Sequence, residues 1–333
     1  MSDDNVTESS ESAFGLWRPT SAGSFSLVIL GASLWGTDPL FRQWLALQVP
    51  VSVIVFWEHF LPALIVAPLA WRGLRRAMMR FTIADWLSLV ALGCGASAIA
   101  TLLFTEAFTY GSPATPVLLQ QIQPLVAVVL ARMILRERTQ RRFAAYLVGG
   151  MAGAYLIAFP HPTDVSVRGW QPAMLTLGAA GLWGMGTVLG RRLGSMIPFK
   201  ELTALRLVFG LLAASAVVAL QGDAPMVWHL GAKSFLALAA LALVPGLLAL
   251  LVYYRGLRGT PASAATIGEL AFPLTALVVV YLAFDATLTA TQWVGAVVLA
   301  TTMVTMGVLK SNNTPTGVDF RQPAHLASLE LTQ

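Results

Sequence analysis

Long apolar runs follow one another along the chain and are separated by short polar connections. Each run has about 18 to 25 residues, enough to cross a hydrocarbon core of about 30 Å as an α-helix. The pattern predicts an all-α membrane protein with ten transmembrane helices, at residues 24–43, 50–70, 84–109, 113–135, 142–160, 171–190, 200–220, 233–257, 261–284 and 289–309.

The composition supports a membrane protein and excludes an ordinary soluble one. Of the 333 residues, 56% are hydrophobic and 11% charged, and the mean hydropathy is +0.71. The pI near 9.7 does not indicate a nucleic-acid-binding protein, because the basic residues lie in short clusters between apolar runs. The expected partners are therefore the lipid bilayer and a small-molecule substrate, with no nucleic acid among them.

Both ends of the chain are polar. Residues 1–23 and 310–333 are expected to be disordered cytoplasmic tails, and the first begins acidic, unlike a cleaved secretory signal. The single cysteine, Cys94, excludes an intrachain disulfide and a cysteine-based metal site.

The basic residues predict the orientation in the membrane. Seventeen Lys or Arg residues fall in the two tails and the connections on the same side, whereas the alternate connections hold three, Arg42, Arg168 and Lys233. Because positive residues stay on the cytoplasmic side, both termini are expected in the cytoplasm of a bacterial inner-membrane protein.

An internal repeat divides the apolar region. Shifting the chain by 148 residues places Trp35 on Trp183 and Gly36 on Gly184, and it carries Glu137 onto Asp285. Several matches at one offset indicate a duplication, with repeats at residues 24–160 and 171–309. Five helices in each repeat give the second the opposite orientation, and such inverted repeats are typical of alternating-access transporters with a site near the midplane.

These motifs resemble the drug/metabolite transporter superfamily, and within it the EamA-type exporters with two five-helix halves. The likeness lies in "LWG" of the first and sixth spans, in Pro124 and Pro273 of spans four and nine, and in the acidic residues that close those spans, Glu137 and Asp285. Among the characterised members of this family, the chain resembles the bacterial amino-acid exporters in architecture. The chain departs from the family pattern at Phe272, which stands where an acid or glutamine often precedes the proline.

Two opposite charges occupy equivalent positions of spans two and seven. Glu58 maps onto Arg206, and both lie at membrane depth, where ionisable residues are rare and mark functional sites. A zwitterionic substrate held between them is one interpretation, because the planar guanidinium suits a carboxylate. The other is that each charge has a local partner or reaches water.

Other polar residues near these charges have two interpretations each. His59 is either a buried histidine bonded to a backbone carbonyl or a proton relay. Asp38 and Glu106 are expected at the membrane interface, and Tyr253 and Tyr254 are expected as interfacial anchors.

The middle of spans four and nine carries a second polar group. Gln120 and Gln123 share a helix face, and Pro124 frees the carbonyl of Gln120. Glu269 and Pro273 stack in the same way in span nine. These residues are expected to line a site, with helix-to-helix hydrogen bonds as the alternative.

The two equivalent tryptophans, Trp35 and Trp183, lie inside spans rather than in an interfacial belt. They either stack on the substrate or pack the core. Gly149 and Gly153 form a GxxxG pattern, for which packing within the bundle is expected rather than dimerisation.

Together these patterns predict a monomeric secondary transporter that exports amino acids or similar small metabolites, without cofactor or metal. Glu58, His59 and Glu269 are the candidates for proton coupling. Drugs, nucleosides or other metabolites are alternative substrates. A membrane-embedded enzyme is a further alternative, but the sequence lacks a nucleophile with a base and paired acids for a metal, so an enzyme is not expected.

Overall fold

The computed structural model describes residues 21–110, 116, 119–139, 141–159, 161, 170–284 and 288–312. In that part of the chain every regular element is a helix. The first half contains α1 (Ser21–Trp35), α2 (Pro39–Ala46), α3 (Val51–Arg80), α4 (Ile83–Val90), the π-helical segment η1 (Ala91–Ile99), α5 (Ala100–Phe108), α7 (Gln123–Ile134) and α8 (Arg141–Ala158). The second half contains α9 (Trp170–Leu193), α10 (Phe199–Gln221), α11 (Ala224–Val227), α12 (Ala232–Leu241), the π-helical segment η2 (Ala242–Leu248), α13 (Ala249–Leu257), α14 (Ala262–Glu269), α15 (Ala271–Phe284) and α16 (Ala290–Asn312).

The helices are those of a multi-pass membrane protein. Within the described residues, six helical segments are long and apolar enough to cross a bilayer, with mean hydropathy between 1.4 and 2.7, and shorter apolar helices accompany them. The predicted all-helical membrane class is confirmed, and the count of ten spans stays a prediction. The predicted tails fall mostly outside the described residues, which begin in α1 and end in α16.

Several predicted spans are not single α-helices. The first is interrupted between α1 and α2, the fourth has a turn at Gln121 and Ile122 before α7, and the ninth is interrupted at Leu270 between α14 and α15. In each case a proline follows closely, because a residue without an N–H is tolerated in the first turn of a helix. Spans three and eight are instead continuous but contain η1 and η2.

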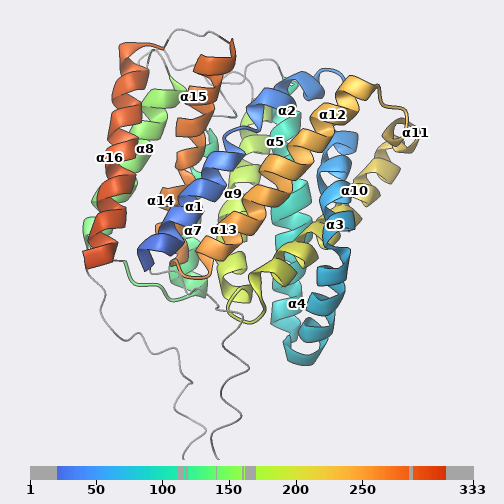
Figure 1. The fold of residues 1–333 in the computed structure, drawn as a ribbon, viewed down its shortest axis with the longest axis horizontal. Helices are drawn as coiled ribbons and strands as arrows, with labels where there is room; N and C mark the ends of the chain where they lie inside the picture. Colours follow the sequence, from blue (N-terminus) through green and yellow to red (C-terminus); the bar gives the residue numbers. More distant parts are fainter. Residues whose placement is uncertain are drawn as a thin grey trace, which may run out of the picture.

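The helices pack as two related halves. In the part of the chain that the structure describes, α3 lies along α10 and α8 along α16, which are pairs of equivalent helices. Contacts of α1 with α13 and α15 have their counterparts in contacts of α9 with α5 and α7. Figure 1 shows α8, α15 and α16 at one end of the bundle, α3, α4 and α10 at the other, and α1, α9 and α13 between them. The contacts made by the helices of one half are thus repeated by the equivalent helices of the other half, as a two-repeat architecture requires.

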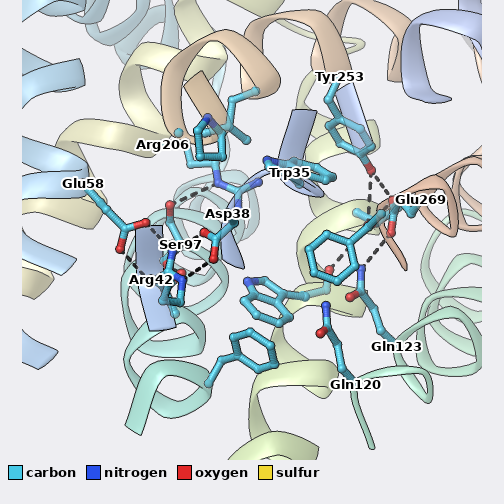
Figure 2. Close-up of a pocket in the computed structure, with 18 of the residues that line it drawn as sticks. Trp35, Asp38, Arg42, Glu58, Ser97, Gln120, Gln123, Arg206, Tyr253 and Glu269 are labelled. Carbon is cyan, nitrogen blue, oxygen red and sulfur yellow. Dashed lines mark hydrogen bonds and ion pairs between the residues drawn. The ribbon is translucent and has the colours of Figure 1, made fainter. Parts of the chain in front are cut away.

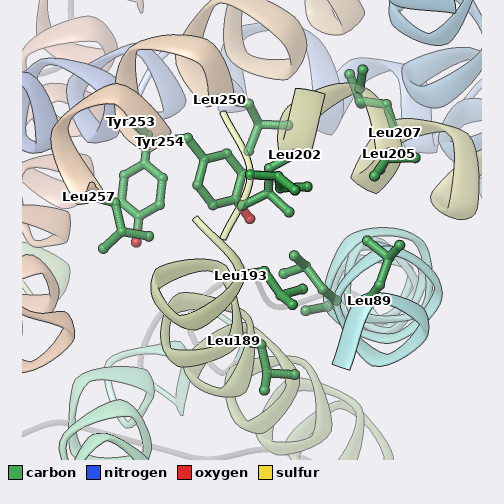
Figure 3. Packing of buried hydrophobic residues seen from close by; sticks show 14 of the residues in the cluster. Leu89, Leu189, Leu193, Leu202, Leu205, Leu207, Leu250, Tyr253, Tyr254 and Leu257 are labelled. Carbon is green, nitrogen blue, oxygen red and sulfur yellow. The ribbon is translucent and has the colours of Figure 1, made fainter. Parts of the chain in front are cut away.

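A leucine-rich core joins the central helices to α3 and α10. Figure 3 shows Leu193 of α9 between Leu189 of the same helix and Leu202 of α10, with Tyr254 of α13 nearby. Burial of such apolar side chains among helices, rather than against lipid, fixes the positions of the helices that surround the site.

Small residues allow a close helix crossing between α8 and α16. A Cβ added at Gly153 would lie 2.8 Å from the backbone nitrogen of Leu299 and 2.9 Å from the carbonyl oxygen of Gly295. The predicted role of this glycine in packing within the bundle therefore agrees with the structure.

Polar contacts also tie the two halves together. The Glu137 carboxylate, just beyond α7, accepts hydrogen bonds from the backbone nitrogens of Ala262 at 2.8 Å and Ser263 at 3.0 Å. It thereby caps the N-terminus of α14, where a negative charge is favoured. Asp85 of α4 forms an ion pair with Arg192 of α9 at 2.6 Å. Asp285, the repeat equivalent of Glu137, lies outside the described residues.

Candidate functional site

A cavity of about 190 Å³ lies between the two halves, where several helices are interrupted or π-helical. Figure 2 shows the Glu58 side and the Glu269 side of this cavity with Trp35 between them. Its lining includes every candidate site residue from the sequence, namely Trp35, Glu58, His59, Gln120, Gln123, Pro124, Trp183, Arg206, Glu269 and Pro273. The structure thus brings these residues together, and their individual roles stay predictions.

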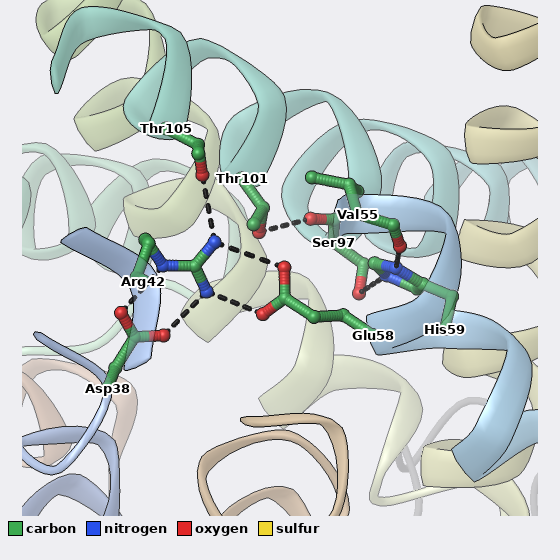
Figure 4. Close-up of polar contacts among 8 residues, drawn as sticks. All are labelled: Asp38, Arg42, Val55, Glu58, His59, Ser97, Thr101 and Thr105. Atoms are coloured by element: carbon green, nitrogen blue, oxygen red, sulfur yellow. Dashed lines mark hydrogen bonds and ion pairs between the residues drawn. The ribbon is translucent and has the colours of Figure 1, made fainter. Parts of the chain in front are cut away.

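Glu58 has its ion partner in Arg42 (Figure 4). The Arg42 guanidinium donates from Nη2 to Glu58 Oε1 at 2.5 Å and from Nη1 to Oε2 at 3.0 Å. It also donates from Nε and Nη2 to the two Asp38 oxygens, at 2.6 and 2.5 Å, and from Nη1 to Thr105 Oγ1 at 2.8 Å. Two carboxylates therefore share one guanidinium, and Arg42 and Glu58 are only 5% and 8% exposed.

The structure agrees with the second interpretation of Glu58, a local partner, rather than with a free charge facing Arg206. Asp38, expected at the membrane interface, lines the cavity and shares the Arg42 guanidinium with Glu58. The interruption before Pro39 starts a new helix whose first turns lie against α3 and α5. Because Asp38 and Arg42 are four residues apart, both side chains lie on the face directed at Glu58.

Arg206 has a different environment. Its Nε donates to Ser97 Oγ at 3.3 Å, its Nη1 to Tyr254 Oη at 2.7 Å and its Nη2 to the Ala96 carbonyl at 3.1 Å. The guanidinium also lies 5.7 Å from the centre of the Tyr254 ring. Among the described residues Arg206 forms no ion pair, and its three hydrogen bonds all go to neutral groups.

His59 links the backbone of α3 to Ser97. Its Nδ1 lies 2.8 Å from the Val55 carbonyl oxygen, and its Nε2 lies 3.0 Å from Ser97 Oγ (Figure 4). Since a carbonyl oxygen only accepts, Nδ1 is the protonated nitrogen and Nε2 accepts from the serine in the neutral ring. This contact is the one expected for a buried histidine bonded to a carbonyl.

Glu269 lies on the other side of the cavity and is held by three neutral donors. Gln123 Nε2 donates at 2.7 Å, Thr187 Oγ1 at 2.9 Å and Tyr253 Oη at 2.5 Å. The donors come from both repeats, so this carboxyl group ties α7 to α9 and α13. Tyr253 and Tyr254 were expected as interfacial anchors, which is wrong, because both are 2% exposed and bind charged side chains.

Aromatic rings form two parts of the wall. The Trp35 ring lies 4.8 Å from Tyr253, and the Trp183 ring lies 5.0 Å from Phe104, measured between ring centres. Both tryptophans line the cavity and are backed by a second ring. Nearby, the side-chain oxygen of Gln120 is buried without a hydrogen-bond partner in the described structure.

Several lining residues carried no distinctive sequence signal. Ser97, Thr101 and Thr187 are small polar residues in apolar runs, where most such residues bond to their own helix. Arg42 did carry a signal, because an acid and an arginine four residues apart predict an ion pair on one helix face. No group of three or more His, Cys, Asp or Glu residues within the described ranges could hold a metal ion.

Comparisons with known proteins agree with this architecture. The chain matches the EamA-like transporter family over residues 23–159 and again over residues 170–307. It is 30% identical over 291 residues to the riboflavin transporter ImpX of Fusobacterium nucleatum subsp. nucleatum, covering 85% of this chain and 97% of that protein. A solved crystal structure of 20% identity has the same fold, with a TM-score of 0.69 over 87% of this chain and 98% of the other.

Proposed function

Because this chain belongs to the EamA-like transporter family, we propose that it moves a small polar organic solute through the central cavity by alternating access. The observation that carries the proposal is that both repeats contribute charged and aromatic side chains to one cavity. In this proposal ten spans form two inverted repeats that rock about the cavity, as in other transporters built from inverted repeats. The protein acts as a monomer in the bacterial inner membrane, with both termini in the cytoplasm.

The geometry favours a zwitterion such as an amino acid as the solute. Arg206 and Glu269 line the same cavity, and neither forms an ion pair at contact distance among the described residues. A substrate carboxylate suits the guanidinium, and a substrate ammonium suits the carboxylate. Glu58, the acid first expected to take the ammonium, is already paired with Arg42, so Glu269 replaces it in this proposal.

Riboflavin is the second candidate solute. The relative from Fusobacterium nucleatum is named for riboflavin, and 97% of its length is covered. The Trp35 and Trp183 rings offer faces for a flat heterocycle, and the unpaired Gln120 oxygen could accept a hydrogen bond from its polar edge. Riboflavin is neutral, so this proposal does not require Arg206 or Glu269 to bind the solute through its charge.

Export is proposed to be coupled to a proton, with Glu58, His59 and Glu269 as candidate carriers. Two carboxylates around one guanidinium leave an excess negative charge at membrane depth, which one proton on Asp38 or Glu58 would remove. Glu269 is the alternative carrier, and its three hydrogen bonds span both repeats, so a change in its charge would affect their packing.

The test is transport in proteoliposomes of labelled amino acids and labelled riboflavin, with and without a pH gradient. We expect the wild type to transport an amino acid, and Arg206→Gln and Glu269→Gln each to reduce the rate at least tenfold. Glu106→Gln is the matched control, because Glu106 does not line the cavity.

Each outcome has a separate meaning. Riboflavin transport that survives both substitutions supports riboflavin as the solute and contradicts the proposal of a zwitterionic solute. Transport that ignores the pH gradient removes proton coupling. If neither solute moves in either direction, both substrate proposals are wrong, while the family membership stands.

A further inference from the structure

Two arginines line the cavity, and their hydrogen-bonding differs. A guanidinium has five N–H groups. Arg42 directs all five at acceptors, four carboxylate contacts and one threonine hydroxyl. Arg206 directs three, one from each nitrogen, so that one N–H on Nη1 and one on Nη2 have no acceptor among the described residues.

The three acceptors of Arg206 are all neutral. They are the Ser97 and Tyr254 hydroxyls and the Ala96 carbonyl. A cation at membrane depth without a counter-ion is costly, and an anion that binds it removes part of that cost. Arg42, by contrast, already has two carboxylates and no N–H to spare. An anionic ligand would therefore bind at Arg206 and not at Arg42.

Buried groups behind Arg206 hold its guanidinium in place. His59 donates from Nδ1 to the Val55 carbonyl, so its Nε2 accepts the Ser97 hydroxyl proton. A lone pair of the Ser97 hydroxyl oxygen then accepts a hydrogen bond from the Arg206 Nε–H. His59 is 4% and Ser97 6% exposed. The histidine and the serine thus set the direction of the guanidinium, and its two remaining N–H groups are left for a solute.

We propose that Arg206 forms an anion subsite of the cavity that binds a carboxylate of the solute, with His59 and Ser97 as positioning residues. The inference rests on the proposed function only in taking the cavity as the solute site. The terminal nitrogens of one guanidinium offer two parallel N–H groups to the two oxygens of a carboxylate, a geometry that lysine does not reproduce. The solute class is then an organic acid or a zwitterion, and a neutral heterocycle lacks the group that this subsite binds.

The test compares two probes of nearly equal shape, phenylacetate and phenylacetamide, in calorimetric titrations of the purified full-length chain in detergent. We expect the wild type to bind the acid at least tenfold more tightly than the amide. Arg206→Gln should bring the two affinities together, and Arg206→Lys should keep part of the preference. Arg80→Gln is the control, because this exposed arginine lies at the end of α3, away from the cavity.

The positioning role has its own readout. His59→Leu removes the acceptor for the Ser97 proton and should lower the acid preference several-fold, while the affinity for phenylacetamide stays the same. His59→Gln should restore the preference, because an amide can donate to Val55 and accept from Ser97. Ser97→Ala tests the same link with a smaller change in volume, in case His59→Leu folds poorly.

Three results would overturn the proposal: equal binding of acid and amide by the wild type, binding of neither probe, or an acid preference that persists in Arg206→Gln. An effect of His59→Leu on both probes alike would remove the positioning role. These outcomes are independent of transport. Riboflavin transport without acid preference overturns the subsite alone, and acid binding that depends on Arg206 without transport of any solute overturns the transport proposal alone.

Discussion

Charged side chains at membrane depth are stabilised in two different ways in this cavity. Asp38, Arg42 and Glu58 form a saturated group in which each carboxylate oxygen accepts a hydrogen bond from one guanidinium. Arg206 and Glu269 are surrounded by neutral donors and acceptors instead. A group whose hydrogen bonds are all formed has no free donor for a ligand. A charge that is held only by neutral hydrogen-bond partners is stabilised further when a ligand of opposite charge binds. The first arrangement therefore leaves no N–H of Arg42 free for a ligand, whereas the second leaves two N–H groups of Arg206 without an acceptor among the described residues.

The saturated group predicts an asymmetry between two substitutions. Arg42→Met leaves the buried Glu58 carboxylate and the partly buried Asp38 carboxylate without their cation, and removing one partner of a buried ion pair costs about 3–5 kcal/mol. Glu58→Gln leaves Arg42 and Asp38 as a neutral pair and should cost clearly less. Thermal unfolding of the purified variants in detergent measures both. Equal losses from the two substitutions would contradict the shared-guanidinium arrangement.

The sequence predicted which residues line the cavity better than it predicted their hydrogen-bond and ion-pair partners. Glu58, Arg206 and Glu269 stand out because charges are rare in apolar runs, and that rarity is visible in one dimension. The partner of Glu58 could not be inferred from depth along straight helices, because the interruption before Pro39 changes the direction of the chain and brings Arg42 inward. Tyr253 was misassigned for a similar reason, since its burial depends on α1 packing along α13.

Helix interruptions and π-helical segments are the elements that shape the site. Pro124 and Pro273 predicted disturbed helices in spans four and nine, and the structure has a turn at or just before each proline. The π-helical segments η1 and η2 lie in equivalent spans of the two repeats, and both contribute to the cavity. Sequence periodicity does not distinguish 3.6 from 4.4 residues per turn over such short stretches, so these segments were not predicted.

Glycine contacts make a prediction about the packing of elements. Gly153→Ala places a Cβ against the backbone of α16, which cannot move as a flexible side chain does, and should destabilise the protein by about 1–3 kcal/mol. Gly181→Ala is the matched control in α9, where a Cβ would meet nothing within 4 Å. It should be neutral or slightly stabilising, because alanine favours helix more than glycine does. Unfolding temperatures of the two variants check the difference.

On the scale of the whole molecule, the contacts of one half have counterparts in the other. The equivalent helices α3 and α10 pack on each other, and so do α8 and α16. The internal repeat that predicted this symmetry is visible in the sequence at few positions, yet the family matches both halves separately. Figure 1 shows the described chain beginning and ending at the same edge of the bundle, where the Arg-rich end of α3 also lies.

The inverted arrangement predicts opposite directions for α3 and α10 across the membrane. We expect α3 to run from the outer side to the cytoplasm and α10 from the cytoplasm to the outer side, since the Arg-rich connections should face inward. Single cysteines in a Cys94→Ser background test this at exposed positions near both ends of each helix, Gln48 and Met79 for α3, Lys200 and Gln221 for α10. A membrane-impermeant maleimide should label Gln48→Cys and Gln221→Cys in intact cells, and Met79→Cys and Lys200→Cys only after permeabilisation. Labelling of Gln48→Cys together with Lys200→Cys in intact cells would mean that the repeats are parallel, and alternating access by inverted halves would then be wrong.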